Sequence, residues 1–169
     1  MVGLKRLDEG FAPLLGDEPK VLVLGSMPSQ QSLEKLEYYG HPQNAFWWIM
    51  AQLFGFSRDL SYAERVLQLQ QSQVAVWDVV HTCHRPGSLD ADIDAQTVIA
   101  NPIPELLQRC SSIKVLCFNG KAAYQLYRKH IERSPTLPCL QLPSTSPAYA
   151  SLRPEGKLLQ WRDLLAYMS

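Results

Sequence analysis

Several features that define large protein classes are missing from this chain. No run approaches the roughly 18 consecutive apolar residues that a membrane-spanning helix needs, so we expect no membrane segment. Residues 1–9 carry acidic side chains where a signal peptide requires an apolar stretch. The 16 Lys and Arg balance 16 Asp and Glu, which excludes a global charge that would attract nucleic acid but leaves room for a local basic patch. We therefore expect a soluble, cytoplasmic protein.

Metal-binding and redox spacings are missing as well. The four cysteines are Cys83, Cys110, Cys117 and Cys139, and none of them forms the C-x-x-C pair of zinc ribbons or thioredoxin-like sites. The run His81–His84 holds metal-binding side chain types, but no second pair of ligands lies at a suitable spacing. We predict no metal site.

The chain also lacks the motifs of several common enzyme classes. It contains neither G-x-x-x-x-G-K-[ST] nor G-x-G-x-x-G, which argues against a Walker loop and a dinucleotide cofactor. No G-x-S-x-G elbow surrounds a serine. No close carboxylate pair stands in the loops after the predicted strands, and Asp90, Asp92 and Asp94 are interpreted as one solvated loop. We expect the protein to need no cofactor.

What is present is an alternation of strand and helix patterns in 169 residues, of which 46% are hydrophobic, a length typical of one domain spanning 1–169. Apolar runs predict strands at 20–25, 74–80, 113–118 and 137–142. Helices are predicted at 43–54, 61–70, 101–110, 119–131 and 157–168, the last with Leu158, Trp161, Leu164, Leu165 and Met168 on its apolar face. The alternation predicts a three-layer α/β/α fold around a mostly parallel four-stranded sheet.

Ligands of such sheets bind beyond the carboxyl ends of the strands. This rule selects the loops 25–29, 78–85, 119–121 and 143–148, and the segment 38–50 follows the first of them. Any chemistry should take place where these five pieces converge.

The segment 38–50, which reads YYGHPQNAFWWIM, is the most informative of the five. Tyr39 offers a flat aromatic face, and Asn44 carries an amide with one acceptor oxygen and two donor hydrogens. Together they predict a pocket for a planar, hydrogen-bonding ligand such as a base. The alternative, which the residues leave open, is that Asn44 caps the helix that follows and Tyr39 is a core aromatic.

The other loops each have a functional and a structural interpretation. Gly25, Ser26 and Met27 can bring backbone amides close to a base or sugar-phosphate, or can simply form a tight connection. Asp78, at the end of a strand, can accept hydrogen bonds from a base or position water, or can cap a helix. The residues Pro143, Ser144, Thr145, Ser146 and Pro147 form a stiff, hydroxyl-rich loop that suits phosphate contacts or an exposed turn. Lys121 begins a helix after Gly120 and can face an anion.

Four motifs in this order resemble the uracil-DNA glycosylase superfamily, over roughly residues 18–168. They are GSMPS at 25–29, GHPQNAFW at 40–47, FNGKAAY at 118–124 and LPSTSPA at 142–148. The pattern is most similar to the hypoxanthine-DNA (deoxyinosine) glycosylase branch, and the second motif is also similar to the H-P-x-N-R-F-W run of mismatch-specific uracil glycosylases.

The resemblance implies a role for several residues. The family's first motif usually holds an Asp or Asn that positions the attacking water, but the matching position here is Met27. In the hypoxanthine branch the Asn of H-P-x-N takes that task, which makes Asn44 the catalytic residue. Tyr39 matches the aromatic that stacks on the flipped base, and the backbone amides of Gly25, Ser26 and Met27 are expected to contact that base. Asp78, from its place at the end of a strand, is the remaining candidate base-binding residue. The loop 143–147 matches the part that grips DNA, and Lys121 is expected to add a DNA contact as part of a local basic patch.

The resemblance therefore implies a monofunctional glycosylase that removes a deaminated base, hypoxanthine above all, from DNA. We expect the protein to be a monomer. The apolar wedge of the uracil enzymes has no direct match, because Ser146 falls near its place, which leaves Ala148 or Tyr149 for that role. One alternative is a uracil or mismatch-specific glycosylase of the same fold, against which Met27 argues. The other is a non-catalytic module that binds a nucleotide or damaged DNA.

Overall fold

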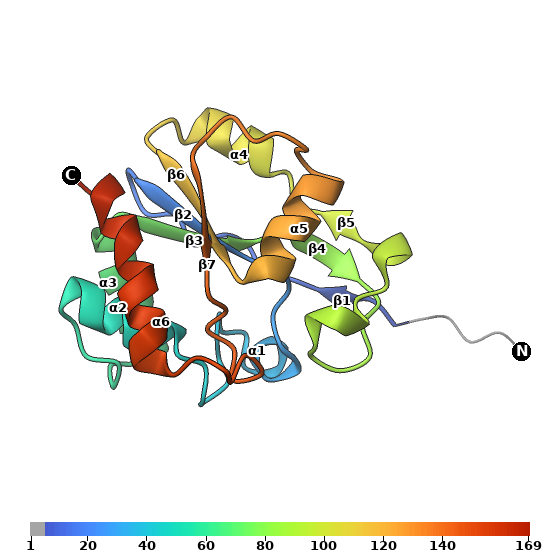
Figure 1. Cartoon of the computed structure of the whole chain (residues 1–169), viewed down its shortest axis with the longest axis horizontal. Coiled ribbons are helices and arrows are strands. Elements are labelled where there is room, and N and C mark those ends of the chain that lie inside the picture. Colours follow the sequence, from blue (N-terminus) through green and yellow to red (C-terminus); the bar gives the residue numbers. More distant parts are fainter. Residues whose placement is uncertain (1–5) are drawn as a thin grey trace, which may run out of the picture.

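The computed structural model describes residues 6–169 and is built around a four-stranded parallel sheet (Figure 1). Its strands are β2 (Val21–Gly25), β3 (Val74–Asp78), β6 (Val115–Asn119) and β7 (Cys139–Leu142), in the order β3-β2-β6-β7. All three strand pairs are parallel, and Val21 lies opposite both Val74 and Val115. The predicted central sheet is confirmed.

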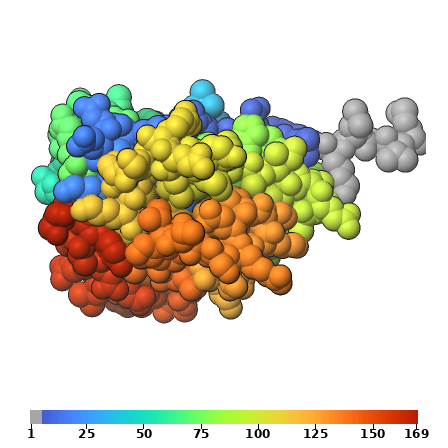
Figure 2. Space-filling view, turned by 90° about the horizontal axis from the view of Figure 1, so that it is seen from above, coloured from blue at the N-terminus to red at the C-terminus, as the bar shows by residue number. Residues whose placement is uncertain are grey.

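Two hydrophobic cores lie on opposite faces of this sheet. Val21 and Val23 of β2 pack with α2 (Phe46–Phe54), α3 (Tyr62–Gln71) and α6 (Pro154–Trp161). Leu22 and Leu24 pack on the other face with α4 (Ile103–Arg109) and α5 (Lys121–His130), the face seen in Figure 2. Because both faces of the sheet are covered, its strands are apolar at nearly every position. The predicted three-layer arrangement is confirmed.

A second, antiparallel sheet was not predicted. It consists of β1 (Asp8–Glu9), β4 (Val80–Cys83) and β5 (Ile99–Ala100) in the order β1-β4-β5. The strand predicted over 74–80 was wrong at its end, because the chain leaves the parallel sheet after Asp78 and Val80 pairs with Ala100. Asp78 to Val80 is buried throughout, so burial continues without a break from one sheet into the other.

The ends of several helices also differ from the prediction. The helix α2 begins at Phe46 instead of residue 43, and the final helix ends at Trp161, after which η3 (Arg162–Tyr167) continues with 3-10 geometry. The tighter winding rotates the last turn, and Leu165, predicted on the buried face, is 39% exposed. The helix α1 (Gln30–Lys35) and the short 3-10 turns η1 (Asp90–Asp92) and η2 (Ala95–Thr97) were not predicted. None of the helices in residues 6–169 combines the length and the apolar character needed to cross a bilayer.

Candidate active site at the carboxyl ends of the parallel strands

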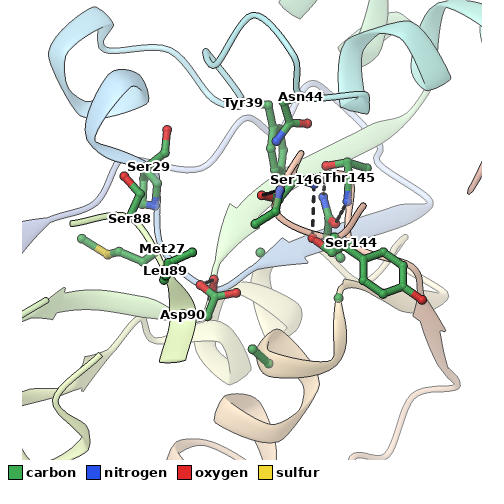
Figure 3. A pocket seen from close by; sticks show the side chains of 18 of the residues that line it. Met27, Ser29, Tyr39, Asn44, Ser88, Leu89, Asp90, Ser144, Thr145 and Ser146 are labelled. Carbon is green, nitrogen blue, oxygen red and sulfur yellow. Dashed lines mark hydrogen bonds between the residues drawn. The ribbon is translucent and has the colours of Figure 1, made fainter. Parts of the chain in front are cut away.

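A cavity of about 350 Å³ opens at the carboxyl ends of the parallel strands (Figure 3). The five segments selected from the sequence all contribute to its lining, and a sixth, residues 88–91, joins them. Figure 3 shows Tyr39 and Asn44 on one side of the cavity, with Met27, Leu89 and Asp90 across from them. A cavity of this size lies within the range of small-molecule sites.

Gly25, at the end of β2, is the point where two polar side chains approach the backbone. It lies opposite Asp78 in the parallel pairing of β2 and β3. A Cβ atom at residue 25 would stand 2.5 Å from Asp78 Oδ1 and 3.0 Å from the Tyr39 hydroxyl oxygen. Only glycine lets the carboxyl and the phenol come this close to the strand.

Tyr39 presents its ring to the cavity from a strained backbone. Its φ is +54°, a left-handed conformation that costs energy for a residue with a Cβ. The following residue is held in place, because the Gly40 N–H donates to Ser32 Oγ at 2.8 Å and the Gly40 carbonyl accepts from Lys35 Nζ at 2.8 Å. The Tyr39 ring stacks on Phe46, with centroids 4.1 Å apart and planes inclined by 30°. One face of the ring is thus used by the core, and a ligand in the cavity can take the other.

Asn44 combines the two roles that the sequence left open. Its Oδ1 accepts a hydrogen bond from the Phe46 N–H at 2.9 Å, so it caps the start of α2, and it also lines the cavity. The backbone N–H of Asn44 donates to the His41 carbonyl at 2.9 Å, and His41 Nδ1 accepts from the Gln43 backbone N–H at 3.1 Å. The capping bond assigns the oxygen and nitrogen of the amide and fixes its orientation toward the cavity.

Two carboxyl groups line the same cavity, which corrects the interpretation of residues 90–94 as a solvated loop. Asp78 is 3% exposed, and its Oδ2 has no hydrogen-bond partner within residues 6–169. Burial, and then the nearby Asp90 carboxylate, raise the pKa of Asp78 to about 7, while Arg85 opposes the shift. Asp90 as a whole residue is exposed in the turn η1, but its carboxyl lines the cavity, and its Oδ1 accepts the hydrogen of Ser26 Oγ. Burial of its carboxyl raises the pKa of Asp90, and the Ser26 hydrogen bond and Arg85 oppose that shift.

The last loop, residues 143–147, is fastened to three elements. Asn119, at the end of β6, makes two hydrogen bonds with Thr145. Its Nδ2 donates to Thr145 Oγ1 at 3.0 Å, and its Oδ1 accepts from the Thr145 N–H at 2.9 Å. The Ala45 N–H donates to the Thr145 carbonyl at 3.0 Å, which joins this loop to the start of α2. Lys157 Nζ donates to the Ser146 carbonyl at 3.2 Å. Burial lowers the pKa of the Lys157 amine.

The structure brings together most of the residues predicted for the site. Those that line the cavity are Gly25, Ser26, Met27, Tyr39, Asn44, Asp78, Lys121, Ser144, Thr145 and Ser146. Pro143 and Pro147 do not line it; the Pro143 carbonyl instead accepts from Trp161 Nε1 at 2.9 Å. Ala148 and Tyr149, the two candidates for the wedge, line the cavity and are exposed.

Asn119 and Asp90 were missed as site residues. A polar side chain that ends a fully apolar strand was a usable signal for Asn119. Nothing in the local sequence distinguished Asp90 from its acidic neighbours, because its position depends on how the loop after β4 folds back over Ser26. Asp92, in the same turn, is exposed and does not line the cavity.

A basic groove of about 450 Å³ adjoins the cavity along α5. Lys121 lines both the cavity and the groove. The groove is also lined by Tyr124, Gln125, Arg128, Lys129, Arg133 and Gln141. The neutral chain therefore carries a local concentration of positive charge beside the cavity. No group of three or more metal-ligating side chains occurs in the described part of the chain.

Comparison with known proteins identifies the class to which this fold and cavity belong. A model of the uracil DNA glycosylase superfamily matches residues 12–165, and the chain therefore belongs to that superfamily. Two relatives carry the name hypoxanthine DNA glycosylase. The one from Methanosarcina acetivorans is 31% identical over 118 residues, which cover 69% of this chain and 73% of the relative. The one from Methanosarcina barkeri is 32% identical over 114 residues, which cover 67% and 71%.

A solved structure supports the same fold. The solution NMR structure of a candidate uracil DNA glycosylase from Methanosarcina acetivorans superposes with a TM-score of 0.82 at 27% identity. The match covers 96% of this chain and 99% of the other. The predicted superfamily and fold class are both confirmed.

Proposed function

We propose that this protein is a monofunctional DNA glycosylase that hydrolyses the N-glycosidic bond of deoxyinosine in DNA, as part of base excision repair. The observation that carries the proposal is the arrangement of Tyr39 and Asn44. The Tyr39 ring keeps one face free for the cavity, and a capping bond fixes the Asn44 amide. Both side chains line the same cavity at the carboxyl ends of the strands. The names of the two Methanosarcina relatives support hypoxanthine as the base.

The first step of the proposed reaction takes the damaged nucleotide out of the helix. Unpairing costs about a few kcal/mol and costs least for a base that pairs poorly, as hypoxanthine does. Stacking on the Tyr39 ring returns roughly 1–3 kcal/mol. The backbone amides of Gly25, Ser26 and Met27, which line the cavity, are available to the base. Ser144, Ser146 and Lys121 contact the phosphates around the extruded nucleotide.

The second step is hydrolysis at the sugar. Positive charge grows on the sugar as the bond to C1′ lengthens. Asn44 Oδ1 has two acceptor sites and uses one of them for the Phe46 N–H, so the other can hold a water molecule against C1′. An amide is a weak base, but little base strength is needed when the bond is largely broken before the water attacks. The reaction requires neither a metal nor an organic cofactor.

The proposal is tested by single-turnover cleavage of labelled duplexes that carry one deoxyinosine or one deoxyuridine. We expect wild type to produce an abasic site from deoxyinosine, and Asn44→Ala to lower this turnover far more than it lowers DNA binding. Asn44→Asp keeps an oxygen that accepts the Phe46 N–H but has no amide. Its comparison with Asn44→Ala separates the effect of losing the capping bond from the effect of losing the amide. Gln43→Ala is the matched control, because Gln43 lies in the same loop, is exposed and does not line the cavity.

Three other results would contradict parts of the proposal. Equal losses of turnover and binding in Asn44→Ala would remove Asn44 from the reaction. Cleavage of deoxyuridine alone would retain the superfamily but make the protein a uracil or mismatch-specific enzyme. Binding to the deoxyinosine duplex without any abasic product would make it a binding module.

We further propose that the protein acts on DNA as a monomer in the cytoplasm. Every residue assigned above to the base, the water or the phosphates comes from one chain. Sedimentation of the protein bound to a short duplex, with a mass of one chain per duplex, is the expected result.

A further inference from the structure

The Asp78 carboxyl has surroundings that suit a neutral acid. It is buried at the end of β3, and its Oδ2 meets no donor within residues 6–169. An ionised carboxylate in such a place would lack the hydrogen bonds that normally stabilise it. Asp90, in contrast, receives the hydrogen of Ser26 Oγ. Of the two carboxyl groups that line the cavity, Asp90 is therefore the one that bears the charge and Asp78 the one that keeps its proton.

The charged and titratable groups around Asp78 support this assignment. Asp90 approaches from η1 and favours the neutral acid. Burial and then Asp78 raise the pKa of Tyr38 and Tyr39, in the loop after α1, so these phenols bring no charge to the site. Arg85, which follows β4, is the opposing charge. Its Nη2 is already bonded to the Pro28 carbonyl and lies 3.6 Å from the Asp8 carboxylate, so its charge is shared with other groups.

We propose that Asp78 is the general acid of the reaction and delivers its proton to the leaving hypoxanthine. This inference rests on the proposed function, since it concerns the same cavity and the same bond. Asp78 lines the cavity together with Tyr39, which is proposed to stack on the base, and both meet at Gly25. A proton donor that acts on the leaving group contributes typically 10²–10⁴-fold to such reactions.

In the proposed step the bond between C1′ and N9 breaks, and its electron pair goes to the base. The Asp78 carboxyl proton moves to N7 or N3 of the base, which leaves as neutral hypoxanthine. The water held by Asn44 forms the new bond to C1′ and gives up a proton, which restores the Asp78 carboxyl. Uracil has no ring nitrogen equivalent to N7, so the proton donor matters more for a purine.

The test combines a change in the enzyme with a change in the substrate. Asp78→Asn keeps the shape of the side chain but cannot transfer a proton. The substrates are duplexes with deoxyinosine, 7-deaza-deoxyinosine or 3-deaza-deoxyinosine, in which a carbon replaces one of the two candidate nitrogens. Single-turnover rates are measured for wild type and variant, and thermal melting verifies that the variant is folded.

We expect Asp78→Asn to lower the rate on deoxyinosine by about 100-fold or more. On one of the two deaza substrates the wild-type rate should be lower than on deoxyinosine by a similar factor. On that substrate Asp78→Asn should be only slightly slower than wild type. The deoxyinosine rate of wild type should fall as the pH rises through about 7, and the variant should lack this dependence.

A uniform loss would overturn the inference. If Asp78→Asn lowers the rates on all three substrates by the same factor, the carboxyl only binds or shapes the cavity. Equal rates for wild type and variant on deoxyinosine would also overturn it. If wild type forms no abasic site from deoxyinosine, the proposed function itself fails, which is a different result from either of these.

Discussion

Asn119 and Thr145 are joined by two reciprocal hydrogen bonds, which tie the last loop of the site to the end of β6. Both residues are buried, and the Thr145 carbonyl also accepts the Ala45 N–H at the start of α2. Two loops that are distant in sequence, the one with Asn44 and the one with Ser146, are therefore held at a fixed separation. In the proposed reaction these loops face the sugar and the phosphates.

We predict that Thr145→Val weakens both the fold and DNA binding, whereas Thr145→Ser preserves them. Valine keeps the shape but leaves Asn119 Nδ2 without its acceptor, and an unsatisfied buried donor costs about 1–3 kcal/mol. Urea unfolding gives the free energy of unfolding, and fluorescence anisotropy gives the affinity for a duplex. A loss in the serine variant as large as that in valine would show that the hydroxyl is not the important group.

The Tyr39 ring is predicted to matter and its hydroxyl to matter little. The hydroxyl is buried and makes no well-formed hydrogen bond within residues 6–169, so Tyr39→Phe should keep the fold and the affinity. Tyr39→Leu removes the stacking surface, worth roughly 1–3 kcal/mol per base, and should weaken binding about 5- to 150-fold. The measurement is the Kd for a duplex with 2′-fluorinated deoxyinosine, which resists cleavage. Equal binding by the leucine variant would contradict base stacking on Tyr39.

The buried Asp78 carboxyl should make the stability of the fold depend on pH. Its pKa is about 7 in the folded protein against an ordinary 3.8, so the native state keeps a proton that the unfolded chain releases. The stability that Asp78 contributes is therefore complete below pH 3.8 and is lost as the pH rises to about 7. The slope is at most about 1.4 kcal/mol per pH unit.

Urea unfolding of wild type and Asp78→Asn between pH 5 and pH 7 measures this effect in the absence of DNA, the range being set by the pKa of about 7. We expect wild type to lose stability relative to the variant as the pH increases. Asp17→Asn is the matched control, because it makes the same substitution at an exposed carboxyl outside the cavity. A constant difference between wild type and Asp78→Asn would mean that Asp78 is ionised throughout this range.

Lys121 is predicted to contact a phosphate. It is exposed, begins α5 and lines both the cavity and the basic groove. Lys121→Gln should weaken binding to all sequences alike and should reduce the slope of log K against log salt by about 1. Lys114→Gln is the control. Lys114 is also an exposed lysine, but it precedes β6, whereas Lys121 follows the other end of that strand. An unchanged slope in Lys121→Gln would place the phosphates elsewhere.

The sequence predicted the sheet and the main loops of the site because those features depend on local patterns. Four apolar runs separated by helical periodicity specify parallel strands, and the rule for their carboxyl ends selects four loops, the first of which leads into the segment with Tyr39 and Asn44. The predicted helix over 61–70 begins at Ser61, and in the structure Ser61 caps α3, its Oγ accepting the Glu64 N–H at 3.2 Å.

The second sheet and the acidic part of the site were not predictable in this way. Residues 74 to 80 are apolar except for Asp78, and a pattern of buried side chains does not tell which of two sheets buries them. The three acids at 90, 92 and 94 look alike in sequence. Only Asp90 meets the Ser26 hydroxyl, because the chain after β4 folds back toward the first loop.

By itself, then, the sequence determined the order of the elements, the motifs of the superfamily and the residues offered by each loop, since all of these are properties of neighbouring positions. The tertiary structure decided how those residues are paired. It placed Asp78 and Asp90 in one cavity, bonded Asn119 to Thr145, and gave Asn44 a capping role beside its place in the cavity. The protonation of Asp78 depends on burial and on a neighbouring charge. Both are set by contacts between distant parts of the chain, which no local pattern records.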